Sequence, residues 1–275
     1  MASSTQKPIH ILLINPNSSS SMTDGIMKAL ESLNLPLHIT ITPFTAPSPA
    51  PSSINNGDDI SHSASVVLSH LTPAFFPSNS NSQSSDSNAY NAILIACFSI
   101  HPLVPSLSSS HPSIATTGIF EASILACLSL LSKDGKWGIV TTGPWWEDHL
   151  SAGVADFLGT TPNTNPASTA TATSAPGKFA GVHTTGLNAS DFHASTPSEV
   201  RRRLRKAAFS LLDSGPVECV VMGCAGMTGL EGLIREVAVE KYGEEEGRAV
   251  YIVDGVKAGI GVLVQMVENK RLFRL

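Results

Sequence analysis

Short apolar runs alternate along the chain with longer segments whose apolar residues recur at helical spacing. Runs such as 91–97 and 217–222 are apolar on both faces, as central strands of a parallel sheet are. The predicted strands are 10–15, 37–42, 91–97, 113–117, 137–142, 179–183, 217–222 and 250–253, and the predicted helices are 23–33, 118–131, 145–158, 197–212, 230–241 and 256–269. Because strands alternate with helices, the pattern predicts an α/β protein with parallel sheets.

The order of these elements occurs twice. In each half one strand ends in a polar turn, at Asn15 and at Thr142, and a later strand leads to a cysteine, at Cys97 and at Cys224. Parallel sheets bind ligands outside the carboxyl ends of their strands. We therefore predict two similar α/β lobes, each with one cysteine in such a position. The first lobe is expected to comprise residues 1–118 plus 250–275, and the second residues 119–249.

Three stretches lack the apolar residues that a packed element needs. Residues 43–53 are rich in Pro and Ser, residues 78–88 are almost entirely Ser and Asn, and residues 160–176 are mostly Thr, Ala, Asn, Ser and Pro. We interpret all three as mobile surface loops.

Composition narrows the possible functions. The chain has 275 residues, is 42% hydrophobic and carries a formal net charge of −5, so a nucleic-acid partner is not expected. The basic run 201–206 has apolar neighbours at helical spacing, and we interpret it as the solvated face of a helix. No run has the roughly 18 apolar residues of a membrane span. We expect a cytoplasmic protein without a membrane partner.

The four cysteines fall into two kinds. Cys127 lies inside an apolar helix and Cys219 inside a strand, where thiols act as core fillers. Cys97 and Cys224 instead follow strands and precede small or polar residues, so backbone N–H groups of a following turn would stabilise a thiolate. Gly226 would let a ligand approach the backbone closely. These two thiols are the candidate catalytic groups.

Several motifs together resemble one known family. They are Ile14-Asn-Pro-Asn-Ser18, Ala96-Cys97-Phe98, Gly118-Ile-Phe-Glu-Ala122, Gly138-Ile-Val-Thr-Thr142 and Gly223-Cys-Ala-Gly-Met227. The chain resembles the aspartate/glutamate/hydantoin racemase superfamily, and within it the hydantoin and allantoin racemases and the fungal Dcg1-like proteins. The resemblance implies two lobes with parallel four-stranded sheets, related by a pseudo-twofold axis, and an active site in the cleft between them.

The resemblance also implies the chemistry. Cys97 and Cys224 would act as acid and base on a carbon next to a carbonyl, without a metal or another cofactor. The expected partner is a small-molecule substrate, and we expect a homo-oligomer because even-numbered assemblies are common among proteins. The residues implied to bind substrate are Asn15, Asn17, Ser99, His101, Thr141, Thr142, Ala225, Gly226 and Met227. The chain departs from bacterial hydantoin racemases in one turn, where Ser99-Ile100-His101-Pro102 replaces a Gly-Asp-Pro run. The substrate therefore stays open among hydantoins, allantoin and amino acids.

Other interpretations remain open from the sequence. His101 either orients a substrate carbonyl or caps the turn before Pro102, and Glu121 is interpreted as structural. One ring of the pair Trp145-Trp146 is expected in the core and the other at the active site. A maleate isomerase or an arylmalonate decarboxylase-type enzyme on the same scaffold, a zinc site at Cys97, Cys224 and His101, and a non-catalytic small-molecule sensor are the alternatives.

Overall fold

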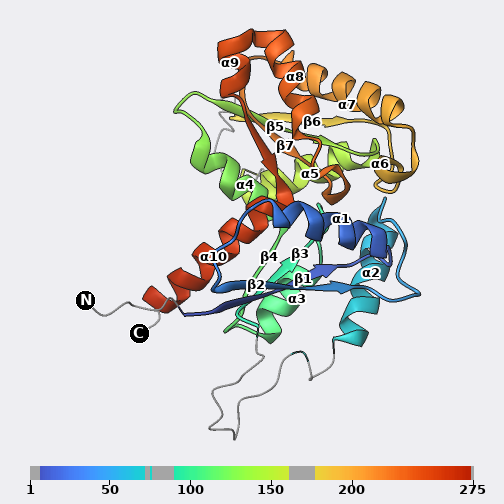
Figure 1. Cartoon of the computed structure of the whole chain (residues 1–275), viewed down its shortest axis with the longest axis vertical. Coiled ribbons are helices and arrows are strands. Elements are labelled where there is room, and N and C mark those ends of the chain that lie inside the picture. The colour runs from blue at the N-terminus through green and yellow to red at the C-terminus, as the bar shows by residue number, and fades with distance from the viewer. Residues whose placement is uncertain (1–6, 72–74, 76–89, 161–176, 274–275) are drawn as a thin grey trace, which may run out of the picture. The chain divides into compact units, whose positions relative to one another are not determined.

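A computed structural model describes residues 7–71, 75, 90–160 and 177–273. The chain divides into two compact units, residues 1–122 with 256–275 (unit 1) and residues 123–255 (unit 2) (Figure 1). The predicted loop 78–88, and residues 161–176 of the predicted loop 160–176, lie outside the described residues. Among the helices of the described ranges, none is long and apolar enough to cross a membrane.

Unit 1 is built around a parallel four-stranded sheet in the order β2-β1-β3-β4. Its strands are β1 (Ile9–Asn15), β2 (Ile39–Thr45), β3 (Ala92–Ile95) and β4 (Ala115–Gly118), and its helices are α1 (Ser20–Glu31), α2 (Gly57–His70), α3 (Leu103–Ser110) and most of α10 (Gly255–Phe273). One face of β1 and β3 presents Leu12, Ile14, Ile93 and Ile95 to a core that α2 and α3 complete. On the other face Leu94 lies against Gly259 of α10. Both faces are therefore covered, as the apolar strand pattern requires.

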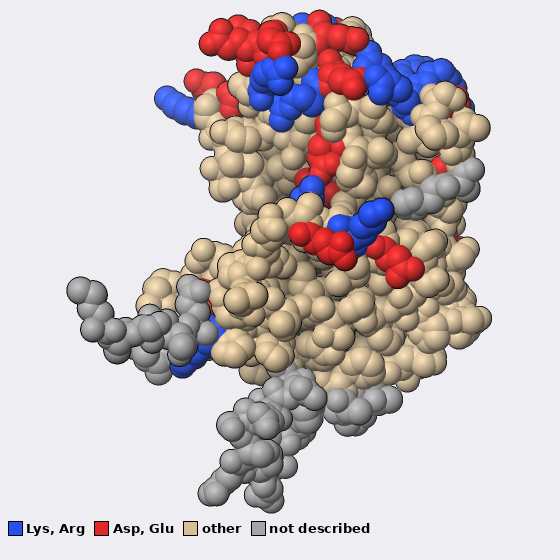
Figure 2. All heavy atoms as spheres, viewed as in Figure 1, with Lys and Arg blue, Asp and Glu red and all other residues tan. Residues whose placement is uncertain are grey.

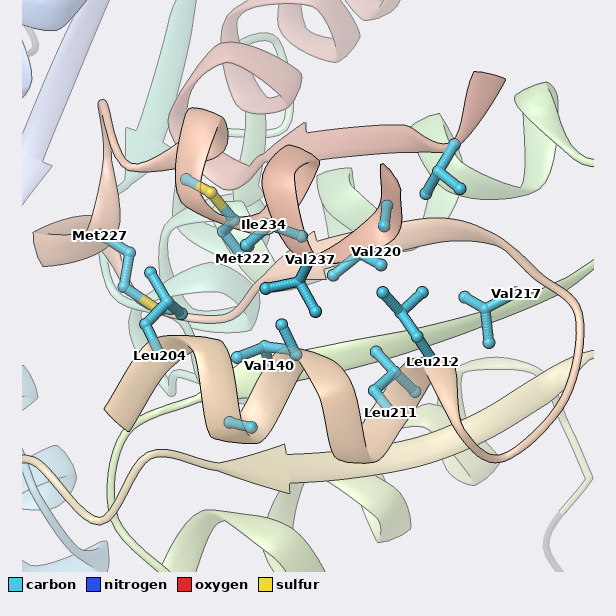
Figure 3. Close-up of a cluster of buried hydrophobic side chains, with 14 residues drawn as sticks. Val140, Leu204, Leu211, Leu212, Val217, Val220, Met222, Met227, Ile234 and Val237 are labelled. Atoms are coloured by element: carbon cyan, nitrogen blue, oxygen red, sulfur yellow. The ribbon is translucent and has the colours of Figure 1, made fainter. Parts of the chain in front are cut away.

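Unit 2 repeats this topology with the strand order β6-β5-β7-β8. Its strands are β5 (Lys136–Thr141), β6 (Phe179–Thr184), β7 (Val217–Met222) and β8 (Tyr251–Asp254). Its helices are most of α4 (Ile119–Leu130), α5 (Trp145–Phe157), α6 (Asp191–Ala194), α7 (Pro197–Leu212), α8 (Glu231–Tyr242), α9 (Glu244–Ala249) and the 3-10 turn η1 (Ala225–Met227). Figure 3 shows α7 and α8 packing Leu204, Leu211 and Val237 against Val140 and Val220 of the sheet.

The two parallel four-stranded α/β sheets confirm the predicted fold class, and three details of the sequence prediction are corrected. Residues 43–53 are not a loose surface loop: β2 extends through Thr45, and Ala46 and Ala50 are buried. Pro43 is tolerated because β2 is an edge strand, where a missing N–H costs no sheet hydrogen bond.

The second correction concerns the strand at residues 250–253, which was assigned to the first lobe. Observed as β8, it pairs in parallel with β7, Met222 opposite Asp254, and so belongs to unit 2. The chain passes to unit 1 only at Val256. Third, the helices α2, α3 and α9 were not predicted, because their serines, glutamates and Pro105 mask the helical apolar pattern.

Candidate active site

The first candidate thiol lies in a turn at the carboxyl end of sheet β2-β1-β3-β4. All residues of β3 are buried, and half-buried Cys97 follows two residues after the strand ends at Ile95. Ser99 is fully buried, and its Oγ donates a hydrogen bond to Cys97 Sγ at 3.4 Å. A donor aimed at the sulfur stabilises the thiolate form. Ser99 therefore contacts the thiol itself, whereas the sequence placed it on the substrate.

His101 lies inside unit 1 and uses both ring nitrogens there. Its Nδ1 accepts a hydrogen bond from the backbone N–H of Leu103 at 3.3 Å, in the first turn of α3. The neutral ring then carries its proton on Nε2, which is 3.1 Å from Ser63 Oγ of α2, and that hydroxyl donates to Ile60 O at 2.8 Å. Burial lowers the pKa of His101 to about 4, so the ring is neutral at physiological pH. These contacts favour the turn-capping interpretation of His101.

Asn15 and Asn17 form a closed network in the turn between β1 and α1. The Asn15 amide donates to Asn17 Oδ1 at 3.0 Å and to Thr23 Oγ1 at 3.0 Å, and Asn17 Oδ1 also accepts from the N–H of Ser19 at 2.9 Å. Both side chains are buried, and Ser19 in turn caps α1. The described contacts of these two amides hold the turn, which was not the role predicted for them.

The second candidate thiol lies in the corresponding turn of unit 2. Cys224 follows two residues after the end of β7 and is the N-cap residue of η1, with its Sγ accepting from the N–H of Gly226 at 3.3 Å. Burial raises the pKa of the Cys224 thiol to about 11, and hydrogen bonds from the N–H groups of Gly226 and Met227 act in the opposite direction. Cys224 as a whole is half-buried. The thiol is thus protonated at neutral pH.

Thr141 and Gly223 fix the backbone that leads into Cys224. Thr141 Oγ donates to Gly223 O at 2.6 Å, and the N–H of Gly223 donates to Val140 O at 2.8 Å. A Cβ on Gly223 would lie 2.7 Å from Ile139 Cγ2 and 2.9 Å from Thr141 Cβ, so only glycine fits here. The neighbouring carbonyl of Thr142 accepts from the N–H of Gly186 at 2.9 Å.

The remaining residues of unit 2 that were predicted to bind substrate, Ala225, Gly226 and Met227, lie in the same turn as Cys224. Ala225 is half-buried beside Cys224, Gly226 is buried and donates to the sulfur, and Met227 is fully buried in the core of unit 2. Met227 therefore packs with α7 and α8 residues (Figure 3). Only its backbone N–H contributes to the environment of the thiol.

The two turns are equivalent within their own units. In each unit the cysteine follows the third strand of the sheet order by two residues, and the residue two positions after the cysteine donates a hydrogen bond to its sulfur. The donor is a serine hydroxyl after Cys97 and a backbone N–H after Cys224. A donor at each sulfur favours the thiolate form of that cysteine, which is the form that an acid/base thiol needs in one half of its cycle.

The other two cysteines lie in the core of unit 2. Cys127 and Cys219 have no exposed surface, and the hydrogen bond between the two thiols, followed by burial, raises the pKa of Cys127. Cys127 remains protonated, and both thiols fill the core. Within the described ranges no group of His, Cys, Asp and Glu side chains has a metal-binding arrangement.

The structure also places the two neighbouring tryptophans, Glu121 and Ser63. Trp146 is 4% exposed and belongs to the core, whereas Trp145 is 41% exposed and stacks on His149 with ring centroids 4.5 Å apart. Burial raises the pKa of Glu121 in the first turn of α4. Ser63 was missed, because its partner His101 is 38 residues away in the chain and no local signal links them.

Comparison with known proteins identifies the family to which this chain belongs. The family model of the Asp/Glu/hydantoin racemases matches residues 11–263. Similar curated proteins are an uncharacterised protein of Schizosaccharomyces pombe (28% identical, covering 94% of this chain and 92% of the relative) and protein DCG1 of Saccharomyces cerevisiae (27% identical, 94% and 96%). A solved allantoin racemase from Klebsiella pneumoniae has a TM-score of 0.67 at 22% identity, covering 97% of this chain and 89% of the other.

The fold and the two turns define a two-unit α/β protein with a cysteine after the third strand of each parallel sheet. The match over residues 11–263 shows that the chain belongs to the Asp/Glu/hydantoin racemase family.

Proposed function

We propose that this protein is a cofactor-independent racemase that inverts a carbon next to a carbonyl, in a hydantoin-type substrate such as a 5-substituted hydantoin or allantoin. Cys97 and Cys224 would be the two acid/base groups. The observation that carries this proposal is the matched position of the two thiols, each two residues past the third strand and each with a hydrogen-bond donor two residues further on. Cys127 and Cys219 share none of these features.

In the proposed reaction one thiolate removes the proton from the substrate carbon, and the other thiol protonates the opposite face. The electron pair of the broken C–H bond is delocalised into the neighbouring carbonyl as an enolate and returns to carbon when the second thiol gives up its proton. Because the pKa of Cys224 is raised to about 11, Cys224 starts as the acid and Cys97 as the base. Each turnover exchanges their protonation states, so the two thiols titrate as one coupled system.

The hydrogen bonds at the two sulfurs support this exchange. The Ser99 hydroxyl and the Gly226 N–H each donate to a sulfur that must carry negative charge in one half of the cycle. A hydrogen bond to a charged group is worth about 1.5–3 kcal/mol, so each donor favours the thiolate over a thiol that lacked it.

The test is deuterium exchange with enantiopure substrates. Allantoin and 5-substituted hydantoins incubated with the enzyme in D2O should lose optical rotation and acquire deuterium at the inverted carbon. Cys97→Ser and Cys224→Ser should each abolish racemisation, whereas Cys127→Ala, which removes a thiol of the core, should retain it. Full racemase activity in either of the first two variants would refute the two-thiol mechanism. Conversion of maleate without exchange on any hydantoin would instead identify the isomerase alternative.

A further inference from the structure

Besides the face that packs in the core, α7 has two further faces, and these two have different partners. Arg201 and Arg205 form ion pairs with Glu236 and Glu240 of α8. Figure 2 shows basic and acidic side chains gathered over the α7–α8–α9 part of unit 2. Residues 203, 206, 207 and 210 instead recur at three- and four-residue spacing, which places them on one helical face toward the end of β6. The predicted solvated face therefore accounts for only part of the basic run.

That second face lines a polar cavity of about 280 Å³ within unit 2. Arg203, Lys206 and Ser210 come from α7, His183 from β6 and Glu147 from the first turn of α5. The cavity is large enough for a phosphate or sulfate ion together with water. It lies apart from the side chains assigned to the two thiol turns, none of which lines it.

Several hydrogen-bond donors of this cavity are not used by the protein. Arg203 binds Glu199 through Nε only, so its two Nη groups make no hydrogen bond within the described ranges. The Lys206 ammonium and the Ser210 hydroxyl likewise form no hydrogen bond or ion pair with a described residue. Unused ammonium, guanidinium and hydroxyl donors in one cavity match the acceptor oxygens of a tetrahedral oxyanion.

The charge of the lining agrees with this geometry. It contains three permanent cations, Arg202, Arg203 and Lys206, against the single carboxylate of Glu147. Glu147 accepts a hydrogen bond from Thr184 at 2.8 Å, and Glu199 offsets part of the arginine charge from outside the cavity. We propose that this cavity is a binding site for a small multivalent oxyanion of the phosphate or sulfate type, held by Lys206, Arg203 and Ser210.

His183 makes the proposed site sensitive to pH. Burial lowers the pKa of His183 and the nearby Glu147 carboxylate raises it, with burial the larger effect. The His183 ring is therefore neutral at pH 7.5, and it gains its proton only at a pH below the ordinary histidine pKa of 6.5. Because Arg202, Arg203 and Lys206 line the same cavity and Glu147 is the acidic neighbour of the ring, the positive charge that protonation adds to His183 is expected to strengthen oxyanion binding.

Isothermal titration calorimetry of the full chain tests the site, with inorganic phosphate and sulfate as probes and sodium chloride adjusted to constant ionic strength. We expect saturable one-to-one binding of both ions. Lys206→Met should weaken it about tenfold, because a charged donor is lost. Arg201→Met removes the same charge from the same helix but outside the cavity, so it should change the dissociation constant less than about twofold.

The outcomes separate the alternatives. Glu147→Gln should tighten sulfate binding, and lowering the pH from 7.5 to below the ordinary histidine pKa of 6.5, far enough to protonate His183, should tighten it in the wild type but not in His183→Asn. Absence of saturable binding would overturn the proposal. Equal weakening by Lys206→Met and Arg201→Met would also overturn it, because it would indicate nonspecific attraction to the basic surface.

Discussion

The hydrogen bond from Thr141 to Gly223 gives a quantitative prediction about the Cys224 turn. Thr141 is 1% exposed, and its hydroxyl donates to Gly223 O at 2.6 Å. Thr141→Val keeps the shape of the side chain but leaves this carbonyl without that donor. Loss of one partner of a buried hydrogen bond costs about 1–3 kcal/mol, since the remaining group stays desolvated. We expect the free energy of unfolding to fall by that amount.

The neighbouring residue provides a matched control. Thr142 is also buried, at 4% exposed, but its hydroxyl makes no hydrogen bond to a described residue. Thr142→Val should therefore change the free energy of unfolding by less than about 0.5 kcal/mol. Urea unfolding followed by circular dichroism measures both variants, and a similar loss in the two would mean that the Thr141–Gly223 bond contributes nothing specific.

The same substitution should act on the chemistry of the thiol. Gly223 directly precedes Cys224, so a weaker hold on its carbonyl should loosen the turn that buries the sulfur. We expect iodoacetamide to alkylate Cys224 faster in Thr141→Val than in the wild type, with the rate at Cys97 as an internal reference, because Cys97 lies in unit 1. Mass spectrometry of the peptides resolves the two sites, and an unchanged ratio of rates would refute the positioning role of Thr141.

Three further predictions follow from local geometry. Because the folded-state pKa of His101 is lowered to about 4 while the unfolded chain has an ordinary histidine, only the unfolded state takes up this proton between about pH 6.5 and 4. The stability is thus complete above pH 6.5 and falls by about 3 kcal/mol toward pH 4, and urea unfolding across this range should show a shallower dependence in His101→Asn. Gly223→Ala should lower the melting temperature or prevent folding, because its Cβ would lie 2.7 Å from Ile139; a wild-type melting curve would contradict the proposed steric limit. Tyr242→Phe removes a hydroxyl that donates to Leu212 O or Gly215 O and accepts from the N–H of Val217, so calorimetry should show a loss of about 1–3 kcal/mol, against no change for the exposed Tyr251→Phe.

The elements with strong apolar periodicity were predictable from the chain alone. β1, β3, β5 and β7 read as strands because parallel sheets covered on both faces need continuous apolar runs. α2 was missed, since serine and histidine interrupt its pattern, and packing of Val66 and Val67 against the sheet adds to the Asn56 cap in stabilising it as a helix. Tertiary burial therefore overrode a weak local preference.

The sequence by itself determined the class of this protein, because the strand–helix alternation and the cysteine after a strand in each half are local features. It could not determine the roles of the polar residues. That Asn15, His101 and Thr141 bind substrate stays a prediction; the described hydrogen bonds of their side chains go to other parts of the same unit. Those partners lie up to 82 residues away along the chain. Only the tertiary structure decides such pairings, because a buried polar group must find whichever partner the packed elements bring within reach.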